Sequence, residues 1–510
     1  MFHVPLYVEG LRSRPLLVLW LAMLAQAALW ILVPLLFYSA PPGDLPQVLA
    51  IGHEFPRSAA IGPPLAYWVA EVAYRAAGLF GVYVLSQICV ICAYWCVFAL
   101  GRAIVGATAA AMAVLLMAGI VAFTVPTPDF NPAILAAALW AAVLLNYWHA
   151  VMEQQRASWY ALGVAAALLL LTSELALILI ALLALFTATT ATGRAALGSR
   201  EGRIVTALLG LVLLLHLFWL ADAGEGLALT LGRLRGAAAA AENTVEWLRL
   251  LAVVLLAHAG LAVIVLVAKG WPRSEAVAPT VVAHGPLDPL AVSYVKLFAL
   301  VPALLATIFA VLAGYRLPIA AEAPLLLLSG LAVVVAGGER IELHHQGMLG
   351  LVWAGLLAVP AILVPIAILV LPWTGTVDLN VARPAAAMGR FFAETYERRT
   401  GHRLAIVSGD ASTAALIALT APGRPSVYFD ADPARSPSIT GEDIRQRGAV
   451  VVWPAAETTP EPPLAVRTHF PDLVAEVPQT FERPVRGRLP PLRIGWGMVR
   501  PASAPAALRR

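Results

Sequence analysis

The stretch RPLLVLWLAMLAQAALWILVPLLFYSAPPGD, residues 14–44, decides the fold of this chain. It has no charged residue between Arg14 and Asp44, and a bilayer span needs about 20 mostly apolar residues. The run follows Arg12 and Arg14 and lacks a small-residue cleavage site. We therefore predict a retained signal-anchor helix at roughly 15–39, with the N-terminus in the cytoplasm.

Similar charge-free apolar runs recur along the first three quarters of the chain. The run 158–190 is too long for one span, and Glu174 interrupts it where a charge is costly. We read it as two short spans with Glu174 near the turn between them, which brings the prediction to about 11 spans. The other expected spans lie at roughly 79–101, 104–125, 131–148, 203–221, 248–268, 291–313, 318–337 and 347–372.

The composition separates a membrane part from a water-soluble part. The chain has 510 residues, of which 60% are hydrophobic and 13% charged, against about 25% charged in soluble domains. This excludes a soluble enzyme, a disordered scaffold and a basic nucleic-acid binder. Residues 1–373 carry 17 basic and 17 acidic side chains, whereas residues 374–510 carry 17 and 13. We predict a transmembrane domain, 1–373, followed by a soluble domain, 374–510.

Basic residues also predict the sidedness of the chain. With a cytoplasmic N-terminus, 11 Lys and Arg residues fall on the inner side and six in the outer loops, in agreement with the positive-inside bias. An odd number of spans then places residues 374–510 outside, in the periplasm of a bacterial inner-membrane protein. If 158–190 is instead one tilted helix, the soluble domain lies in the cytoplasm.

The soluble domain has an α/β pattern. Strands that alternate with helices indicate a small, largely parallel sheet. We expect helices at 384–400, 411–420 and 440–447, strands at 404–408, 426–429 and 449–453, and an edge strand at 492–499.

Acidic side chains in the outer loops are the main candidates for chemistry. Asp44 directly follows the first span, in a loop that also holds His53, Glu54 and Arg57. Such groups at a membrane boundary can deprotonate a nucleophile or bind a phosphate or metal; a solvated loop is the alternative. Asp129 lies in the turn before the span that begins near residue 131, where an N-cap role is also open. We predict that Asp44 and Asp129 converge on one site.

Further candidates lie elsewhere in the membrane part. Glu174 is half-buried by its sequence position and needs a partner or water. Tyr315 and Arg316 open the tenth span from outside, where a guanidinium can hold a phosphate; snorkelling to the interface is the alternative. Residues 65–79 look like an amphipathic surface helix with a Glu71–Arg75 pair, and 222–247 could form a second one.

The order of these features resembles the GT-C membrane glycosyltransferases of family 39. That group includes the protein O-mannosyltransferases, the lipid A aminoarabinose transferases and bacterial relatives acting on lipopolysaccharide. The resemblance covers roughly residues 15–340. Its motifs are Asp44, Pro63-Pro64-Leu65, Phe80-Gly81 with Arg102, Thr127-Pro128-Asp129, Trp159 with Leu162-Gly163, and Tyr315–Pro318.

The resemblance implies a fold and a reaction. The fold would be a GT-C membrane domain with a small extracytoplasmic α/β domain. The donor would be a sugar on a polyprenyl phosphate, and the acceptor would be a lipid, polysaccharide or protein. The sugar would be transferred by one displacement that inverts the anomeric carbon. Asp44 would be the base or would position the acceptor, Asp129 would be the second carboxylate, and Arg316 with Arg57 would take the phosphate.

The remaining implied roles are more general. His53, Glu54, Glu174 and Tyr315 would assist substrate binding. No nucleotide or other cofactor is expected, since the lipid carrier replaces one, and the need for a divalent cation is open.

Three positions depart from the family pattern. Leu45 stands where an acid often follows the first aspartate, Gly62 stands where a histidine or acid often precedes Pro-Pro-Leu, and Glu174 stands where a lysine is usual. They leave open a catalytically inactive homologue with an assembly role. A transporter or lipid flippase is the other alternative. Transporters tend to have ionisable groups near mid-membrane, whereas those of this chain gather at the outer ends of the spans.

Overall fold

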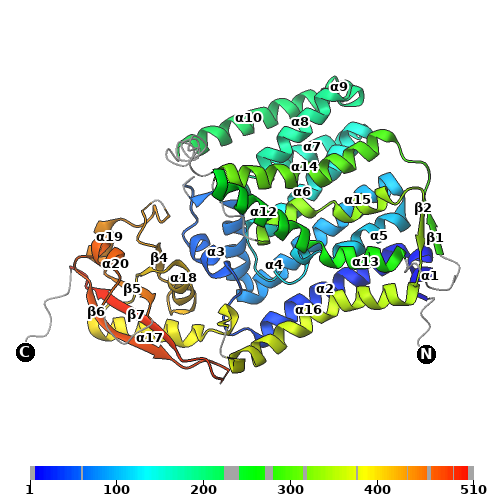
Figure 1. Ribbon diagram of the computed structural model, residues 1–510. Helices are drawn as coiled ribbons and strands as arrows, with labels where there is room; N and C mark the ends of the chain where they lie inside the picture. The colour runs from blue at the N-terminus through cyan, green and yellow to red at the C-terminus, as the bar shows by residue number, and fades with distance from the viewer. Residues whose placement is uncertain are drawn as a thin grey trace, which may run out of the picture. The chain divides into compact units, whose positions relative to one another are not determined.

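A computed structural model describes residues 6–58, 61–222, 240–269, 280–313, 319–374, 377–433, 435–455, 461–485 and 487–502 (Figure 1). The chain divides into two units. Unit 1 comprises Met1–Ile31, Tyr83–Pro128 and Pro132–Ile362, and unit 2 comprises Leu32–Val82, Asp129–Asn131 and Leu363–Arg510. Unit 2 therefore contains the loop after the first span and the turn at Asp129 together with the predicted soluble domain.

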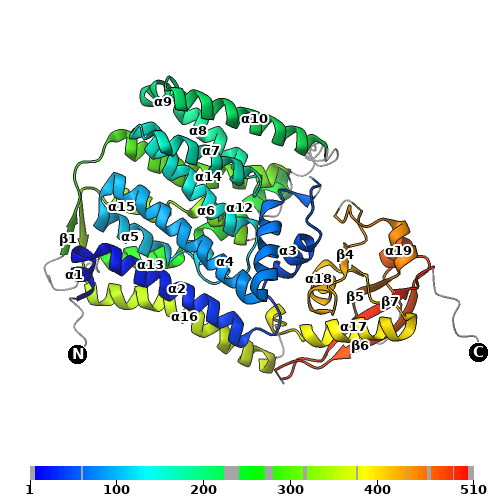
Figure 2. The ribbon, with the colours of Figure 1, turned by 180° about the vertical axis from the view of Figure 1, so that it is seen from behind.

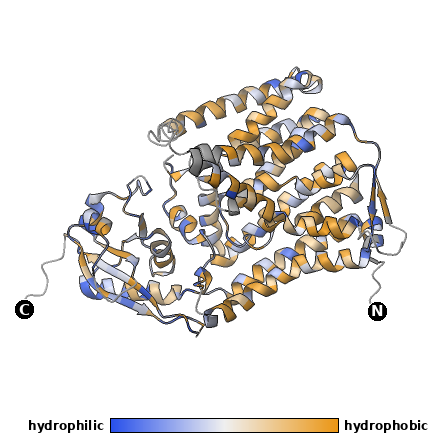
Figure 3. Cartoon of the chain, in the orientation of Figure 1, coloured by the Kyte–Doolittle hydropathy of each residue, from blue (hydrophilic) through white to orange (hydrophobic). Residues whose placement is uncertain are grey.

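The helices show a multi-pass membrane protein. Among the described residues six helices are long and apolar enough to cross a bilayer, or up to eight if two bent helix pairs each count as one span. Most residues of these helices are coloured as hydrophobic in Figure 3. The six are α2 (Pro15–Phe37), α4 (Leu65–Val105), α6 (Pro132–Tyr147) with its π-helical continuation η3 (Trp148–Met152), α10 (Arg200–Asp222), α14 (Pro289–Ala313) and α16 (Gln346–Thr374). The bent pairs are α8 (Ala176–Thr189) with α9 (Ala191–Leu197), and α12 (Ala240–Ala257) with α13 (Ala259–Lys269).

Shorter elements fill the remaining predicted spans. The run 158–190 forms α7 (Arg156–Leu170) and α8, and Glu174 lies in the turn between them, as predicted. The prediction of one continuous helix at 318–337 was wrong. The structure has a 3-10 helix that contains Pro324, η5 (Ile319–Leu326), and a separate α-helix after it, α15 (Ser329–Ala336). Proline lacks the N–H that an α-helix interior needs. The other short elements are α1 (Leu6–Ser13), α5 (Ala107–Met117) and η2 (Val121–Phe123).

Helix α4 contains both the predicted surface helix and the span that follows it. Its helical geometry breaks at Ala77 and Gly78, where Gly78 has a φ of +60°. Glycine adopts this left-handed conformation without the steric cost of a Cβ. The residues before the break belong to the amphipathic segment predicted at 65–79.

Aromatic side chains form part of the core of unit 1. Tyr147 stacks on Tyr294 with ring centroids 5.9 Å apart, and Phe186 and Phe298 pack edge-on beside them. The Tyr294 hydroxyl donates to the Leu144 carbonyl at 2.8 Å, and the Tyr147 and Thr187 hydroxyls share a 2.7 Å hydrogen bond. Both phenols thus have internal partners, as polar groups inside a membrane require. Around this core, α7 contacts α6, α8 and α10 (Figure 1).

The C-terminal part of unit 2 is an α/β layer, as predicted. Its sheet has the strand order β4-β3-β5-β7-β6. The strands are β3 (Ile406–Gly409), β4 (Ser426–Phe429), β5 (Ala449–Pro454), β6 (Val474–Phe481) and β7 (Leu492–Val499), and the helices are η6 (Asn380–Ala382), α17 (Ala385–Thr400), α18 (Ala411–Thr420), α19 (Gly441–Arg447) and α20 (Leu464–His469). The predicted bounds of α18, β4 and β7 are confirmed to the residue.

Two expectations about this sheet were wrong. Strand β7 is an interior strand, since it pairs antiparallel with both β5 and β6. The sheet is also mixed rather than largely parallel, because only β3 forms parallel pairs, with β4 and β5. Both errors come from β6, whose Pro478 lies at an irregularity between Glu476 and Gln479. Proline in a sheet is confined to edges and bulges, and β6 is an edge strand.

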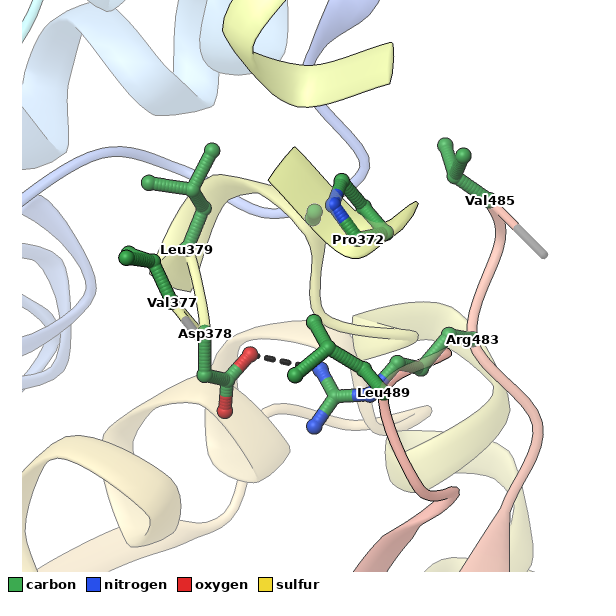
Figure 4. A pocket seen from close by; sticks show the side chains of 8 residues that line it. Pro372, Val377, Asp378, Leu379, Arg483, Val485 and Leu489 are labelled. Atoms are coloured by element: carbon green, nitrogen blue, oxygen red, sulfur yellow. Dashed lines mark hydrogen bonds and ion pairs between the residues drawn. The ribbon is translucent and has the colours of Figure 1, made fainter. Parts of the chain in front are cut away.

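The segment that connects α16 to the α/β layer is held by hydrogen bonds to the connection between β6 and β7. The Pro372 carbonyl accepts hydrogen bonds from the backbone amides of Arg488, at 2.8 Å, and Leu489, at 3.2 Å. Arg483 donates to Asp378 at 2.5 Å across a small cavity (Figure 4). These contacts tie the strand connection 482–491 to the end of the last long helix.

Candidate functional site

The predicted base, Asp44, lies at the start of a short helix on unit 2. The chain leaves α2, turns through Pro41-Pro42-Gly43 and enters α3 (Leu45–His53) with Asp44 as its N-cap residue. The Asp44 side chain forms no capping hydrogen bond and is exposed. Its Oδ1 accepts only a long contact, 3.4 Å, from the Gln47 amide. The carboxylate is therefore exposed to solvent.

Asp129 caps this helix from a distant part of the sequence. Its Oδ1 accepts the backbone N–H of Leu45 at 2.9 Å, and it also accepts the backbone N–H of Asp44. Amides at a helix N-terminus have no partner within the helix and favour a negative group. Asp129 thus serves as the capping group that Asp44 does not supply. The sequence analysis left open that Asp129 is the N-cap of the span that begins near residue 131. Asp129 does cap a helix, but that helix is α3.

Glycine at position 43 makes room for this contact. A Cβ on Gly43 would lie 1.9 Å from Asp129 Oδ2, and Gly43 has a φ of +49°. Both the space and the backbone conformation therefore require glycine. Asn131 also helps to hold the turn, since its side-chain amide donates to the Asp129 carbonyl at 3.1 Å.

The Asp129 carboxyl titrates far from its ordinary range. It is only 9% exposed, and burial raises its pKa from 3.8 to about 7. The nearby Asp44 charge raises it further, whereas the amides of Asp44, Leu45 and Asn131 oppose the shift. The structure thus brings together one exposed carboxylate and one buried carboxyl that changes protonation near neutral pH. Paired carboxyls with different environments are suited to general acid–base chemistry.

The other end of α3 contacts the amphipathic segment of α4 and the α/β layer. His53 Nδ1 lies 3.3 Å from Glu71 Oε1, and Glu54 accepts a 2.6 Å hydrogen bond from the Ser426 hydroxyl. These two predicted substrate-binding residues therefore already have protein partners. Arg57 is exposed in the loop that follows.

Glu71 is the buried centre of a charge network. Its side chain is fully buried, and its Oε1 accepts hydrogen bonds from Arg75 at 2.7 Å and Arg424 at 2.9 Å. Arg424 also donates to the Leu49 carbonyl at 3.0 Å and stacks on the Tyr74 ring. The Glu71–Arg75 pair is the one predicted from the sequence.

Arg424 is a residue that sequence reasoning missed. It comes from the turn between α18 and β4, where α18 packs against α3 (Figure 2). It lies 353 residues after Glu71, and nothing in the local pattern around it indicates a buried partner.

The remaining predicted residues belong to unit 1 or fall outside the described residues. Glu174 is exposed in the α7–α8 turn of unit 1. Tyr315 and Arg316, and most of the predicted surface helix 222–247, fall outside the described residues. In the described part of the chain no three His, Cys, Asp or Glu side chains are grouped to hold a metal ion, and metal dependence stays open.

Comparisons with known proteins support the resemblance. A family model described as dolichyl-phosphate-mannose-protein mannosyltransferase matches residues 62–219. The chain shares its fold with ArnT from Cupriavidus metallidurans bound to undecaprenyl phosphate, at 13% identity and a TM-score of 0.54, over 95% of this chain and 98% of that one. The apo ArnT structure matches at 13% identity and a TM-score of 0.50, over 96% and 98%. No curated protein sequence matches the chain significantly. Residues 62–219 therefore match this mannosyltransferase family, and the chain as a whole shares the fold of ArnT.

Proposed function

We propose that the chain transfers a sugar from a polyprenyl phosphate to a lipid, polysaccharide or protein acceptor, with the reaction centred on Asp44. The carrying observation is the placement of Asp44 at the N-terminus of α3, with Asp129 held against the two amides that begin that helix. That ArnT was solved with undecaprenyl phosphate bound supports a donor of this class.

The reaction is a single displacement at the anomeric carbon. Asp44 accepts the proton from the acceptor as its nucleophilic atom forms the new bond to that carbon. The bond from the carbon to the phosphate oxygen breaks at the same time, and the polyprenyl phosphate leaves with the electron pair. Inversion follows because the acceptor attacks the face opposite the leaving group.

Each charged group has a role in that step. Asp44 is exposed, so it can reach an acceptor, and a general base must lie within hydrogen-bond distance of the proton it removes. Asp129 is a positioning residue, since its carboxyl fixes the first turn of α3 and therefore the Asp44 backbone. Arg57 and Arg316 are the proposed phosphate ligands, because a guanidinium binds a phosphate in a bidentate manner. His53, Glu54, Glu174 and Tyr315 remain proposals for substrate contacts.

The proposed setting is the outer face of a bacterial inner membrane. A cytoplasmic N-terminus places the loop after α2, and with it Asp44, outside the cell membrane. A lipid-linked donor explains why the chain needs a membrane domain at all. It also removes the need for a nucleotide site.

A transfer assay tests the proposal. The purified full-length protein is incubated with radiolabelled polyprenyl-phosphate sugars and candidate lipid acceptors. Asp44→Asn removes the base without changing the side-chain size and should lower the rate by about 100-fold or more. Glu394→Gln, an exposed carboxylate on α17, serves as the control and should leave the rate unchanged. An Asp44→Asn protein that is expressed normally and transfers sugar at the wild-type rate would remove Asp44 from the mechanism.

A further inference from the structure

A large apolar groove lies in unit 1, at the end of the helices where α2 and α16 begin. It has a volume of about 1150 Å³, above the usual range of small-molecule sites. Its floor consists of apolar side chains of α5, α13 and α15, among them Met112, Leu115 and Ile264. We call it the α16 groove, since α16 lines its length from Gln346 to Ala354.

Small residues on α16 keep the groove open. Gly347, Gly350 and Ala354 all line it and follow one another at helical spacing on one face. In membrane proteins such a face normally lets a neighbouring helix approach closely. Trp353 of the same helix donates a hydrogen bond to the Leu115 carbonyl at 2.8 Å and so links α16 to α5 at the groove.

The rim of the groove is polar and carries more positive than negative charge. Lys269 ends α13, and Arg340 begins β2 (Arg340–Leu343), which pairs with β1 (Thr280–Ala283). Both are exposed, and one acid, Glu342, stands beside them on the rim. In the part of the chain that the structure describes, neither cation forms an ion pair.

Two further features of the rim favour an anion. The Nδ1 atom of His344 is buried and has no hydrogen-bond partner among the described residues. The N-terminus of α16 also opens at the rim, since Gln346 and Gly347 line the groove, and the first amides of a helix attract negative charge. Two exposed cations, a histidine with a buried unpartnered nitrogen, and the N-terminus of α16 therefore lie at one end of the groove.

We propose that the α16 groove binds an anionic glycerophospholipid, with its phosphate at Lys269, Arg340 and His344 and an acyl chain between α5 and α16. Water along the apolar floor would lack polar partners, so an acyl chain is the better occupant there. The groove has apolar side chains along its floor and charged residues at its rim, an arrangement that matches the acyl chains and the headgroup of a phospholipid. The residues that line the groove belong to unit 1, whereas Asp44 belongs to unit 2.

Lipid binding to the purified full-length protein tests this proposal. Phosphatidylglycerol in mixed micelles should bind at least tenfold more tightly than phosphatidylcholine, whose headgroup has no net charge. The paired variant Lys269→Ala with Arg340→Ala should weaken phosphatidylglycerol binding by about tenfold or more. Arg156→Ala, an exposed arginine of the same unit whose side chain is 85% exposed, should not change it. Inorganic phosphate alone should not displace the lipid, since it leaves the apolar channel empty.

The acyl chain is tested separately. Gly350→Trp fills the channel and should abolish binding, whereas Gly355→Trp on the same helix, where a Cβ meets no atom within 4 Å, should not. In the unmodified protein, phosphatidylglycerol with a photoreactive acyl chain should crosslink to residues 112–116 and 346–354. Equal binding of both lipids, or crosslinks spread evenly over all apolar helices, would overturn the proposal. Binding that survives Gly350→Trp in a folded protein would also overturn it.

Discussion

Replacing Asp129 by asparagine should remove a specific pH dependence from the stability of unit 2. The buried carboxyl has a pKa of about 7 in the folded chain against an ordinary value of 3.8. The folded state therefore binds this proton more tightly than the unfolded state. The contribution of this proton to the free energy of unfolding is complete below about pH 4 and is lost as the pH rises through about 7.

The size of the effect follows from the two pKa values. A difference of about three units corresponds to about 4 kcal/mol over the whole titration. Between pH 5.5 and 7.5 the wild-type protein should lose about 2 kcal/mol of it, because the unfolded carboxyl is already ionised there and the folded one is titrating. Asparagine keeps an oxygen acceptor for the Leu45 amide but cannot ionise, so this loss should be absent in Asp129→Asn.

Thermal unfolding of the detergent-solubilised full-length protein measures the difference. The wild-type midpoint should fall relative to that of Asp129→Asn as the pH rises from 5.5 to 7.5, by about 2–4 °C for each kcal/mol. Asp129→Ala serves as the second variant. It leaves two amides of α3 without this acceptor and should lower stability by about 1–3 kcal/mol relative to Asp129→Asn at every pH. Parallel midpoint curves for wild type and Asp129→Asn would refute the titration of Asp129.

Two other predictions concern the contacts around α3. Gly43→Ala should displace the Asp129 carboxyl and lower transfer activity as strongly as Asp129→Ala does. Gly62 is the control, because it has a φ of +94° but open space around the position of a Cβ. Gly62→Ala should lower the free energy of unfolding by only about 1 kcal/mol and keep activity, and equal activity of the two variants would contradict the steric argument. Arg424→Ala should destabilise the protein by about 3–5 kcal/mol in thermal or denaturant unfolding, because it leaves the Glu71 charge buried with fewer partners. Adding Glu71→Gln should recover part of that loss, and fully additive effects would show that the two side chains are not coupled.

Local sequence patterns determined most of the secondary structure. Charge-free apolar runs predicted the long helices, because a span is specified by its own length and hydropathy. Turn residues and alternation fixed α18, β4 and β7 in the α/β layer, and the i,i+4 spacing of Glu71 and Arg75 predicted their ion pair. Strand β6 was missed because its proline and polar residues weaken the strand pattern, and that omission misplaced β7 at an edge.

The candidate site depended on contacts that no local pattern encodes. The sequence placed Asp44 and Asp129 in outer loops, but only the tertiary structure put the Asp129 carboxyl on the first amides of α3, 84 residues away from its own position. The same holds for Arg424 and Glu71, which are 353 residues apart. Hydropathy and turn chemistry act over a few residues, whereas the pairing of distant side chains depends on how whole helices and strands pack. The sequence alone therefore specified the helices and their polar ends, and the packing of unit 2 decided which of those polar groups meet.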